Sequence, residues 1–349
     1  MLSRQVYPRI VRLSEPVVSQ ELQEIFSNSN VCATVGNFDG LHLGHCALFS
    51  ELSCVSREYR NPYLVVVTFR PYPRQVLGNG YETKELLTCI GSKLGILSYY
   101  GINCVVVIRF TKSFASMGAS DFLRKYFIKF LRVKHLVVGY NWGFGKNRFG
   151  GVGLLKNFCN QHNVNLSIVQ PVEVDGIRVS SSAVRELLRQ GKVKTASKLL
   201  GRFYSVMGRV LHGSGRGAKI GFPTANLFHV EGFVPKNGVY ACFVDTSDGC
   251  VYEAVVNIGV RPTFRDINTS DVVVLEAYIL TQKALSLYGT KISVRFVERL
   301  RDELQFKSTN ALQEAISHDI QVANSVFQEI NPARMSFEQL LAQSLVIKN

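Results

Sequence analysis

Between residues 31 and 180, short apolar runs alternate with longer segments of mixed polarity. The short runs are rich in β-branched residues and have the length of strands, whereas the longer segments have the composition and length of helices. This alternation predicts an α/β domain with a parallel, Rossmann-like sheet covered by helices on both faces. The predicted strands are residues 31–35, 63–69, 104–109, 134–139 and 166–169, and the predicted helices are residues 48–60, 85–100, 118–131 and 153–162.

The pattern changes after Phe203, where glycine, proline and asparagine separate short apolar runs that have no long helix between them. Such punctuation is typical of an antiparallel β-barrel. A closing amphipathic helix is predicted over residues 311–327, because Leu312, Ile316 and Ile320 recur on one face. The predicted strands are residues 204–211, 238–245, 251–257, 273–280 and 291–300.

Two helical segments join these patterns. Ser180, Ser181 and Ser182 precede a helix over residues 183–190, and a second helical segment ends at Leu200-Gly201. We therefore expect an N-terminal α/β domain over residues 1–186, a helical linker over residues 187–202 and a barrel domain over residues 203–349.

The length of 349 residues fits a two-domain interpretation. Lys and Arg outnumber Asp and Glu by 40 to 26, and the net charge of +14 favours polyanionic partners without choosing among nucleotides, nucleic acid and an anionic membrane surface. The basic residues are scattered, so a solvated basic surface is favoured over a dedicated nucleic-acid patch. Oligomerisation leaves no readable signal.

The cysteines and the apolar runs bear on location. The eight cysteines form no C-x-x-C pair and mostly lie inside apolar runs, which predicts buried thiols in a reducing compartment and hence a cytoplasmic protein. No apolar stretch approaches the roughly 20 residues of a membrane helix. Arg4, Arg9 and Arg12 weakly resemble a transit peptide, but nearby prolines and the lack of a serine-rich run favour a plain N-terminus.

The stretch VGNFDGLHLGH at residues 35–45 follows the first predicted strand. In a parallel sheet the first strand-to-helix turn is the usual phosphate site. His42 and His45, with the close-approach glycines Gly36 and Gly44 beside helix N-terminal amides, supply donors for a triphosphate. A histidine there would stabilise phosphate charge without being a nucleophile or a metal ligand. The alternative for this stretch alone is a capped turn with incidental histidines.

A second anion site is predicted at SSSAVR, residues 180–185, where hydroxyls lie at a helix N-terminus and an arginine follows one turn in. Alone, serines before a helix are usually only caps. Together with the H-x-G-H turn they are similar to the two signature motifs of the nucleotidyltransferase superfamily, which transfers a nucleotidyl group from a triphosphate and releases pyrophosphate.

The C-terminal half contains a candidate phosphate loop, GRVLHGSGRGAKIGFPTANL, at residues 208–227. Its backbone amides and positive charges suit phosphates, although glycine-rich hairpin turns are commonplace. Thr224 and Asn226 are two residues apart, so on a strand they would face the same side and offer Mg²⁺ hard oxygen ligands, completed by ATP phosphates and water. The residues predicted to bind ATP or ADP here are Gly213, Gly215, Arg216, Gly217, Lys219, Thr224 and Asn226.

Glu276 is the candidate base for phosphorylating an alcohol, because it lies in the otherwise apolar run 272–280. A lone acid in a strand is more often on the solvent face. Val274 and Tyr278 share its side, however, which favours a position facing a cleft.

Four segments resemble the FAD synthetase module of the bacterial bifunctional riboflavin kinase/FMN adenylyltransferase family: VGNFDGLHLGH, TFRPYPRQVL at 68–77, GYNWGFGKNRFGG at 139–151 and VSSSAVRELLRQGKV at 179–193. The resemblance implies that residues 139–151, including Asn141 and Phe144, contact the flavin or the nucleotide. It also implies an ATP pocket that is shaped by Asn37, Phe38, Asp39 and Gly40 and in which ATP contacts His42, His45, Ser181, Ser182 and Arg185.

Several positions depart from this family's pattern. Arg70 and Tyr72 stand where Glu and His are more usual in the T-F-x-P-x-P stretch, and Ser182 conservatively replaces Thr. Asn141-Trp142 stands where Asp-Phe is usual. The lost carboxylate at Asn141 bears on the efficiency of adenylyl transfer rather than on its existence.

The C-terminal half resembles the riboflavin kinase module of the same family through GxGRGxxxGFPTAN, NIGVRPTF at 257–264, LEAYIL at 275–280, LYGTKISVRFVERLRDE at 287–303 and the closing helix. This implies that Thr224 and Asn226 hold Mg²⁺, that Glu276 is the general base toward the ribityl 5′-hydroxyl, and that the glycine-rich loop covers ADP. Residues implied to lie near the flavin or in loop contacts are Asn257, Arg261 and Arg301.

The resemblance spans about residues 30–325 and implies a bifunctional enzyme that acts on riboflavin, FMN, FAD and ATP with Mg²⁺ at each site. The first alternative is a monofunctional riboflavin kinase with a weakened adenylyltransferase domain, motivated by Asn141 and Arg70. The second is a nucleic-acid-binding regulator on the same scaffold, suggested by the charge and supported by no binding motif.

Overall fold

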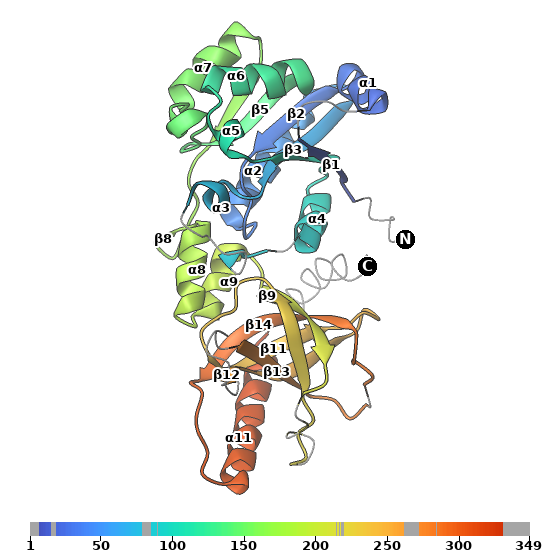
Figure 1. Cartoon of the computed structure of the whole chain (residues 1–349), viewed down its shortest axis with the longest axis vertical. Coiled ribbons are helices and arrows are strands. Elements are labelled where there is room, and N and C mark those ends of the chain that lie inside the picture. Colours follow the sequence, from blue (N-terminus) through green and yellow to red (C-terminus); the bar gives the residue numbers. More distant parts are fainter. Residues whose placement is uncertain are drawn as a thin grey trace. The chain divides into compact units, whose positions relative to one another are not determined.

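The computed structural model describes residues 7–14, 19–78, 85–88, 90–213, 215, 217, 220–261, 272–283 and 285–330, with the backbone alone given for residues 90–92, 260–261 and 272–273. Contacts divide the chain into two compact units, drawn in Figure 1. The N-terminal unit comprises Met1–Thr83 and Lys93–Val179, and the C-terminal unit comprises Lys84–Ser92 and Ser180–Asn349.

The N-terminal unit is built on a parallel sheet whose described strands run in the order β1-β4-β3-β2-β5-β6. Most residues of β2, β3 and β4 are buried and apolar, as in a sheet covered on both faces. The predicted α/β fold of this half is therefore confirmed. The strands are β1 (Arg9–Leu13), β2 (Asn30–Val35), β3 (Pro62–Arg70), β4 (Cys104–Arg109), β5 (Val133–Gly139) and β6 (Asn165–Val169).

The helix predicted over residues 48–60 spans Leu43–Ser56, and the one predicted over residues 85–100 spans Ile90–Tyr99. The helices Gln20–Asn28, Pro73–Leu77 and Lys112–Ala115 were not predicted. The helix predicted over residues 118–131 is a short α-helix followed by a π-helix, in which the Leu131 N–H donates to the Tyr126 carbonyl. The connecting elements are α1 (Gln20–Asn28), α2 (Leu43–Ser56), α3 (Pro73–Leu77), α4 (Ile90–Tyr99), α5 (Lys112–Ala115), α6 (Ala119–Phe122), η2 (Leu123–Phe130), η3 (Lys146–Arg148), α7 (Val152–Gln161) and the hairpin β7 (Glu173–Val174) and β8 (Ile177–Arg178).

The edge strand β1 was absent from the sequence-based prediction. Arg9 and Arg12 interrupt its apolar residues and conceal the alternation that buries Val11 and Leu13. The strand pairs in parallel with β4. Arg9 Nη1 lies 2.8 Å from Glu21 Oε1 of α1, so the arginine that disguises the strand also ties it to the following helix.

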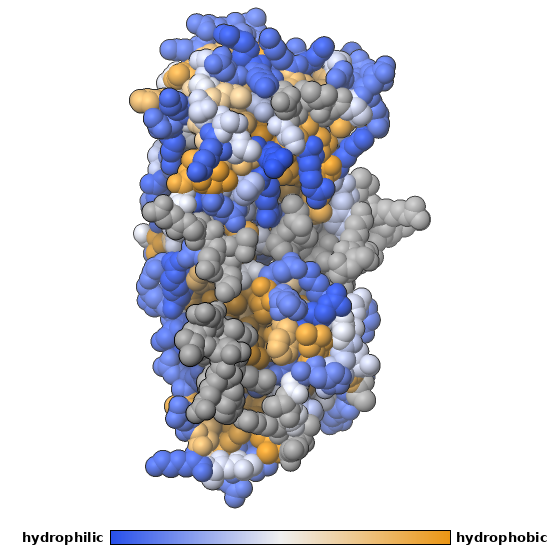
Figure 2. All heavy atoms as spheres, in the orientation of Figure 1, coloured by the Kyte–Doolittle hydropathy of each residue, from blue (hydrophilic) through white to orange (hydrophobic). Residues whose placement is uncertain are grey.

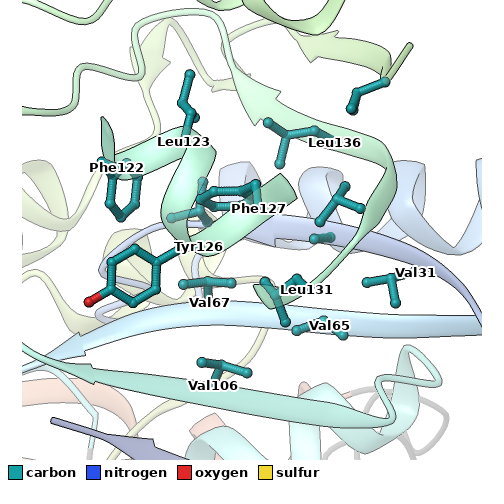
Figure 3. Packing of buried hydrophobic residues seen from close by; sticks show 14 of the residues in the cluster. Val31, Val65, Val67, Val106, Phe122, Leu123, Tyr126, Phe127, Leu131 and Leu136 are labelled. Atoms are coloured by element: carbon teal, nitrogen blue, oxygen red, sulfur yellow. The ribbon is translucent and has the colours of Figure 1, made fainter. Parts of the chain in front are cut away.

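The core of the N-terminal unit lies where α6 and η2 pack on the sheet, as Figure 3 shows. Phe122, Tyr126 and Phe127 are buried there with Val65 and Val67 of β3. Burial of each such aromatic side chain stabilises the fold by about 1.5–3 kcal/mol. This packing fixes the strands whose carboxyl ends carry the candidate site.

The C-terminal unit contains a closed antiparallel barrel in the order β10-β13-β12-β11-β14-β9, which confirms the predicted barrel. Strand β10 was not among the predicted runs, because polar residues interrupt ANLFHVE. It closes the barrel by pairing with both β9 and β13. The strands are β9 (Tyr204–Leu211), β10 (Ala225–Glu231), β11 (Gly238–Asp245), β12 (Val251–Arg261), β13 (Val272–Ile279) and β14 (Lys291–Arg301).

Three helices accompany the barrel. The predicted closing helix is α11 (Thr309–Gln328), which buries Ala323 and Phe327 against Phe243 and Val255 on the outer face of β11 and β12. The predicted junction helices are α8 (Ser181–Arg189) and α9 (Val193–Leu200), and α9 ends at Gly201 in the left-handed conformation, with φ 70°.

Hydrophilic residues cover most of the described surface on the face shown in Figure 2, with smaller apolar groups among them. Within the described ranges, no helix is both long and apolar enough to cross a membrane. The seven cysteines in those ranges are free thiols.

Candidate functional site

The first candidate site lies where the sheet of the N-terminal unit changes direction. Strands β2 and β5 are neighbours, with Ala33 opposite Leu136, and the chain leaves them toward opposite edges of the sheet. Ligands bind at the carboxyl ends of strands at such a switch point. The predicted segments 35–45 and 139–151 both begin there, so the fold brings together two stretches that are far apart in the sequence.

The H-x-G-H turn forms the start of α2. His42 is the N-cap, and its Nδ1 accepts a hydrogen bond from the His45 N–H at 3.3 Å. A neutral imidazole that accepts at Nδ1 carries its proton on Nε2, so His42 is arranged as an Nε2 donor. The rings of His42 and His45 stack with centroids 3.7 Å apart. Two imidazoles therefore lie side by side at a helix N-terminus, which favours anions.

Backbone geometry before α2 holds these rings in place. Phe38 is buried with φ 48°, and its ring centroid lies 5.2 Å from that of His45. A Cβ on Gly36 would come within 3.1 Å of the Phe38 ring, and one on Gly44 within 3.2 Å of His42 Nδ1. A side chain at either position would therefore crowd one of these rings. Of the remaining residues predicted to shape this pocket, Asn37 is exposed and Asp39 and Gly40 are buried.

The T-F-x-P-x-P stretch follows β3 beside this turn, because Thr68 Oγ1 donates to the Asn37 carbonyl at 3.3 Å. Tyr72 is buried, and its hydroxyl accepts a hydrogen bond from the Lys93 ammonium. The Arg70 guanidinium lies 5.0 Å from the centre of the Tyr72 ring. Arg70 and Tyr72, two of the residues that depart from the family pattern, therefore form a cluster with Lys93 in which two cations contact a phenol.

The segment after β5 folds back on itself. The Phe144 N–H and the Gly150 N–H each donate to the other residue's carbonyl at 2.9 Å. The rings of Trp142 and Phe144 stack with centroids 4.2 Å apart, and Phe144 belongs to the core. Of the two predicted flavin contacts in this segment, Asn141 is exposed and Phe144 is buried.

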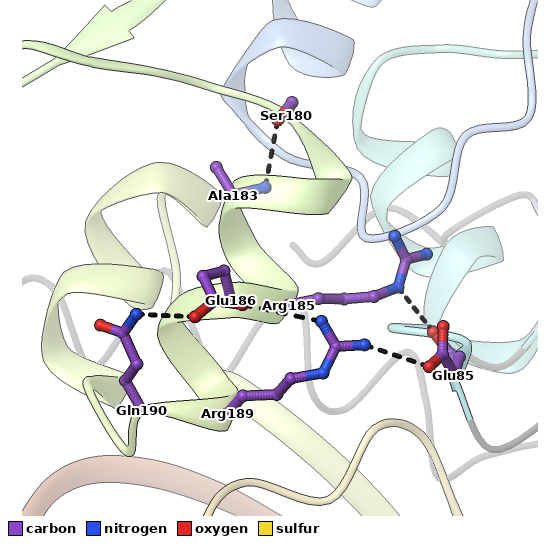
Figure 4. Close-up of polar contacts among 7 residues, drawn as sticks. All are labelled: Glu85, Ser180, Ala183, Arg185, Glu186, Arg189 and Gln190. Atoms are coloured by element: carbon purple, nitrogen blue, oxygen red, sulfur yellow. Dashed lines mark hydrogen bonds and ion pairs between the residues drawn. The ribbon is translucent and has the colours of Figure 1, made fainter.

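The second predicted anion motif forms the start of α8 in the C-terminal unit. The helix begins at Ser181, two residues before the predicted start at residue 183. Ser180 is the N-cap and accepts from the Ala183 N–H at 3.1 Å, which leaves Ser181 and Ser182 in the first turn (Figure 4). Arg185 is 6% exposed, and its Nε donates to the Glu85 carbonyl at 2.7 Å. No pattern in the sequence pointed to this partner, which lies 100 residues away. Joint action of this motif with His42 and His45 stays a prediction.

The second candidate site is a row of polar residues across three strands of the barrel. Asn226 of β10 and Asn257 of β12 both lie directly opposite Glu276 of β13. Directly opposed residues share a face of a sheet. The adjacent Leu275 and Ala277 are fully buried, whereas Glu276 is half-buried, so the row lies on the outer face of the barrel.

The glycine-rich loop approaches this row. A Cβ on Gly213 would come within 2.5 Å of the Asn226 amide, and one on Gly217 within 3.3 Å of Thr224 Oγ1. Both predicted oxygen ligands therefore contact loop backbone that only glycine allows. Gly215 has φ 68°. Arg216, Lys219 and the side chain of Arg261 lie outside the described residues.

Arg301 is the last of the residues predicted for this site. Arg301 donates through Nε and Nη2 to the two carboxylate oxygens of Asp319 at 2.8 and 2.7 Å, so it clamps α11 to the barrel. Its predicted flavin contact stays a prediction.

In the described part of the chain, no three His, Cys, Asp or Glu side chains gather as a metal site. The hydroxyl and amide oxygens of Thr224 and Asn226 fit a hard cation that takes its remaining ligands from phosphates and water.

Two family models match the chain, one described as FAD synthetase over residues 25–183 and one described as riboflavin kinase over residues 200–327. The chain is 35% identical over 300 residues to the bifunctional riboflavin kinase/FMN adenylyltransferase of Escherichia coli K12, which covers 86% of this chain and 94% of that protein. The protein of that name from Buchnera aphidicola of Acyrthosiphon pisum is also 35% identical, with the same coverage of 86% and 94%.

A relative from Bacillus subtilis with the same name is 33% identical and covers 85% of this chain and 92% of its own. Among solved structures, the crystal structure of a macrolide-efflux protein from Streptococcus pneumoniae has a TM-score of 0.80 at 28% identity, over 90% of this chain and 98% of that one. This likeness supports the fold.

Proposed function

The chain belongs to the bifunctional riboflavin kinase/FMN adenylyltransferase family, and on this premise we propose that riboflavin phosphorylation takes place at the barrel and adenylyl transfer at the parallel sheet. It phosphorylates riboflavin with ATP to give FMN and ADP, and it adenylylates FMN with a second ATP to give FAD and pyrophosphate. The observation that carries this division is that the FAD synthetase match covers the parallel sheet and the riboflavin kinase match covers the barrel.

We assign riboflavin phosphorylation to the row Asn226, Glu276 and Asn257. Glu276 takes the proton of the ribityl 5′-hydroxyl as its oxygen bonds to the γ-phosphorus of ATP, and ADP leaves. The register that sets Glu276 between two amides supports this role, since amide N–H groups can orient a carboxylate. The loop backbone at Gly213, Gly215 and Gly217 accommodates the phosphates. By family resemblance, we also propose that Arg261 and Arg301 contact the flavin.

Mg²⁺ is the metal we propose for this site, held by Thr224 and Asn226. When bound, it neutralises phosphate charge and orients the transferred group. The oxygen-only donor pair and the glycine backbone packed against it support the assignment. Chelation of Mg²⁺ with EDTA should stop both reactions, and added Mg²⁺ should restore them.

Adenylyl transfer is assigned to the turn at α2. A phosphate oxygen of FMN attacks the α-phosphorus of ATP, and pyrophosphate leaves. His42 and His45 donate hydrogen bonds to the phosphates as charge develops on them. The capping bond that leaves the proton of His42 on Nε2 supports a donor role. The parts of Ser181, Ser182, Arg185, Asn141 and Phe144 rest on the family resemblance.

We also propose a cytoplasmic location, because the free thiols in the described ranges fit a reducing compartment. Labelling of the intact protein with a thiol reagent in unfolding buffer, without reductant, should modify every cysteine.

Chromatography of the products tests the bifunctional conclusion. Incubation with riboflavin, ATP and Mg²⁺ should yield FMN first and FAD later. Accumulation of FMN with no FAD would instead establish a monofunctional kinase with a weakened adenylyltransferase domain. His45→Ala should abolish FAD formation and spare FMN formation, which separates loss of one site from loss of the fold.

A further inference from the structure

Arg185 is a buried cation whose position depends on a residue distant in sequence. It is 6% exposed, and its Nε donates to the main-chain carbonyl of Glu85 at 2.7 Å. A buried guanidinium is tolerated only when hydrogen bonds replace its water. The carbonyl of Glu85 is therefore part of what holds this side chain in place.

Glu85 is in turn held by the same helix. Its Oε1 accepts from Arg189 Nη2 at 3.1 Å, as Figure 4 shows. Arg185 and Arg189 are four residues apart on α8 and thus lie on one face. The Arg189 guanidinium also lies 5.3 Å from the centre of the Phe233 ring. Two arginines of one helix therefore hold Glu85, one through its main-chain carbonyl and one through its carboxylate.

The Nε bond decides how Arg185 presents its charge. Arginine recognises a phosphate best through two parallel N–H groups in one plane. A bond to Nε from the side of Glu85 fixes that plane and directs the terminal nitrogens away from the carbonyl. If Glu85 shifts, the long side chain regains rotamers and the plane is no longer fixed.

We propose that Glu85 is a positioning residue for adenylyl transfer, which acts through Arg185 and is itself held by Arg189. The proposal rests on the proposed ATP-binding role of Arg185. The Glu85–Arg189 ion pair is largely exposed, with 39% and 45% of the two side chains accessible, so its loss changes stability little. Leu87 and Thr88 are buried, so the chain beyond Glu85 keeps its packing when the ion pair is lost, whereas the Glu85 carbonyl loses a tether. The expected defect is therefore in ATP binding and not in folding.

The experiment measures FAD formation from supplied FMN by the full-length chain. Glu85→Ala and Arg189→Ala should each raise KM for ATP about five- to tenfold and leave kcat within about twofold, because an interaction coupled to a binding residue is lost. Riboflavin phosphorylation serves as the internal control and should not change. Glu186→Gln is the matched control: Glu186 lies 3.8 Å from Arg189 Nη1 on the same helix, and its carboxylate accepts a hydrogen bond from Gln190 Nε2.

A double-substitution cycle tests whether the effect passes through Arg185. Arg185→Lys keeps the charge but has no Nε fork, so it should raise KM for ATP by itself. In the Arg185→Lys background, Glu85→Ala should then add no further rise. Additive effects, or an unchanged KM in Glu85→Ala, would overturn the positioning role while leaving ATP binding by Arg185 intact. An unchanged KM in Arg185→Lys and Arg185→Ala would overturn the ATP-binding role of Arg185 and the inference with it.

Discussion

Glu276 lies between the amide side chains of Asn226 and Asn257, each directly opposite it on a neighbouring strand. An amide donates hydrogen bonds to a carboxylate and orients it, whereas an adjacent ammonium or guanidinium would hold it ionised and weaken it as a base. Among the residues on this row, the neighbours therefore suit a group that must accept a proton from a fixed direction.

Glu276→Gln should reduce the rate of FMN formation at least about a hundredfold, because the amide retains the size of the side chain but accepts no proton. FAD formation from supplied FMN should continue at the rate of the unsubstituted protein. Both products are measured by chromatography. Undiminished riboflavin phosphorylation by the variant would show that Glu276 is not the base.

Gly213 is a residue at which one methyl group should matter. A Cβ there would lie 2.5 Å from the Asn226 side chain, so either the loop or the amide must move. Gly213→Ala should raise KM for ATP in riboflavin phosphorylation about tenfold, which corresponds to about 1.4 kcal/mol of lost binding. Gly153→Ala is the control, because a Cβ at Gly153 meets nothing within 4 Å. Equal kinetics for the two variants would contradict the packing argument.

Some contacts of individual site residues could be predicted from the sequence and others could not. The alternation of Val274, Glu276 and Tyr278 predicted a shared face, and Val274 is indeed buried while Glu276 is half-buried. The opposition of Glu276 to Asn226 and Asn257 was not predictable, because it depends on the register of three strands in a closed barrel. The contact between Arg185 and Glu85 was not predictable either, because the two residues are 100 positions apart and only the folded chain brings them together.

At the scale of an element, strand β5 carries a titratable group into the sheet near the amino ends of its strands. His135 lies opposite Cys32 of β2 and Asn165 of β6. Its Nε2 is 3.0 Å from Ser167 Oγ and its Nδ1 is 3.3 Å from the Tyr59 hydroxyl. Burial lowers the pKa of His135 below its ordinary value, against smaller opposing contributions from Glu58 and Glu51. The fold therefore favours the neutral ring.

This lowered pKa gives the stability of the N-terminal unit a defined pH dependence. Below the ordinary value of 6.5 the unfolded chain binds a proton that the folded chain still excludes, so the free energy of unfolding should fall as the pH drops from that value toward the lower folded pKa and level off beneath it. Trp142, the one tryptophan of the chain, reports unfolding of this unit by fluorescence. Urea midpoints of the unsubstituted protein and of His135→Gln are compared between about pH 7 and pH 5.5. The variant should show the flatter dependence, and parallel curves would contradict this prediction.

Elements were predictable where a single period dominated the sequence. Strands β4, β9 and β11 have the bounds predicted from their apolar runs. Strands β1 and β10 were missed because arginines in one and polar residues in the other interrupt the run, and their place is fixed by pairing with β4 and with β9 and β13. The π-helical turns of η2 were missed because aromatic residues at helical spacing do not distinguish a π-helix from an α-helix.

At the scale of the whole molecule, one chain contains both the segment that matches riboflavin kinase, which forms FMN, and the segment that matches FAD synthetase, which uses it. The change from strand–helix alternation to a glycine-punctuated barrel pattern was visible in the sequence and gave both fold classes. The grouping of residues 85–88 with the C-terminal unit was not visible, because it depends on contacts such as that between Glu85 and Arg185. The predicted bounds at residues 186 and 203 stay a prediction.

Because phosphorylation is assigned to the barrel row and adenylyl transfer to the turn at α2, FMN released by one molecule should serve as substrate for another. His45→Ala protein, which retains the kinase row, and Glu276→Gln protein, which retains the turn at α2, should each fail to convert riboflavin to FAD. An equimolar mixture should restore FAD formation after a lag in which free FMN accumulates, and the lag should shorten as total protein concentration rises. Chromatographic time courses at two concentrations measure both effects. A mixture that forms FMN but no FAD would show that FMN must pass between sites of one chain, and the independence of the two units would then be wrong.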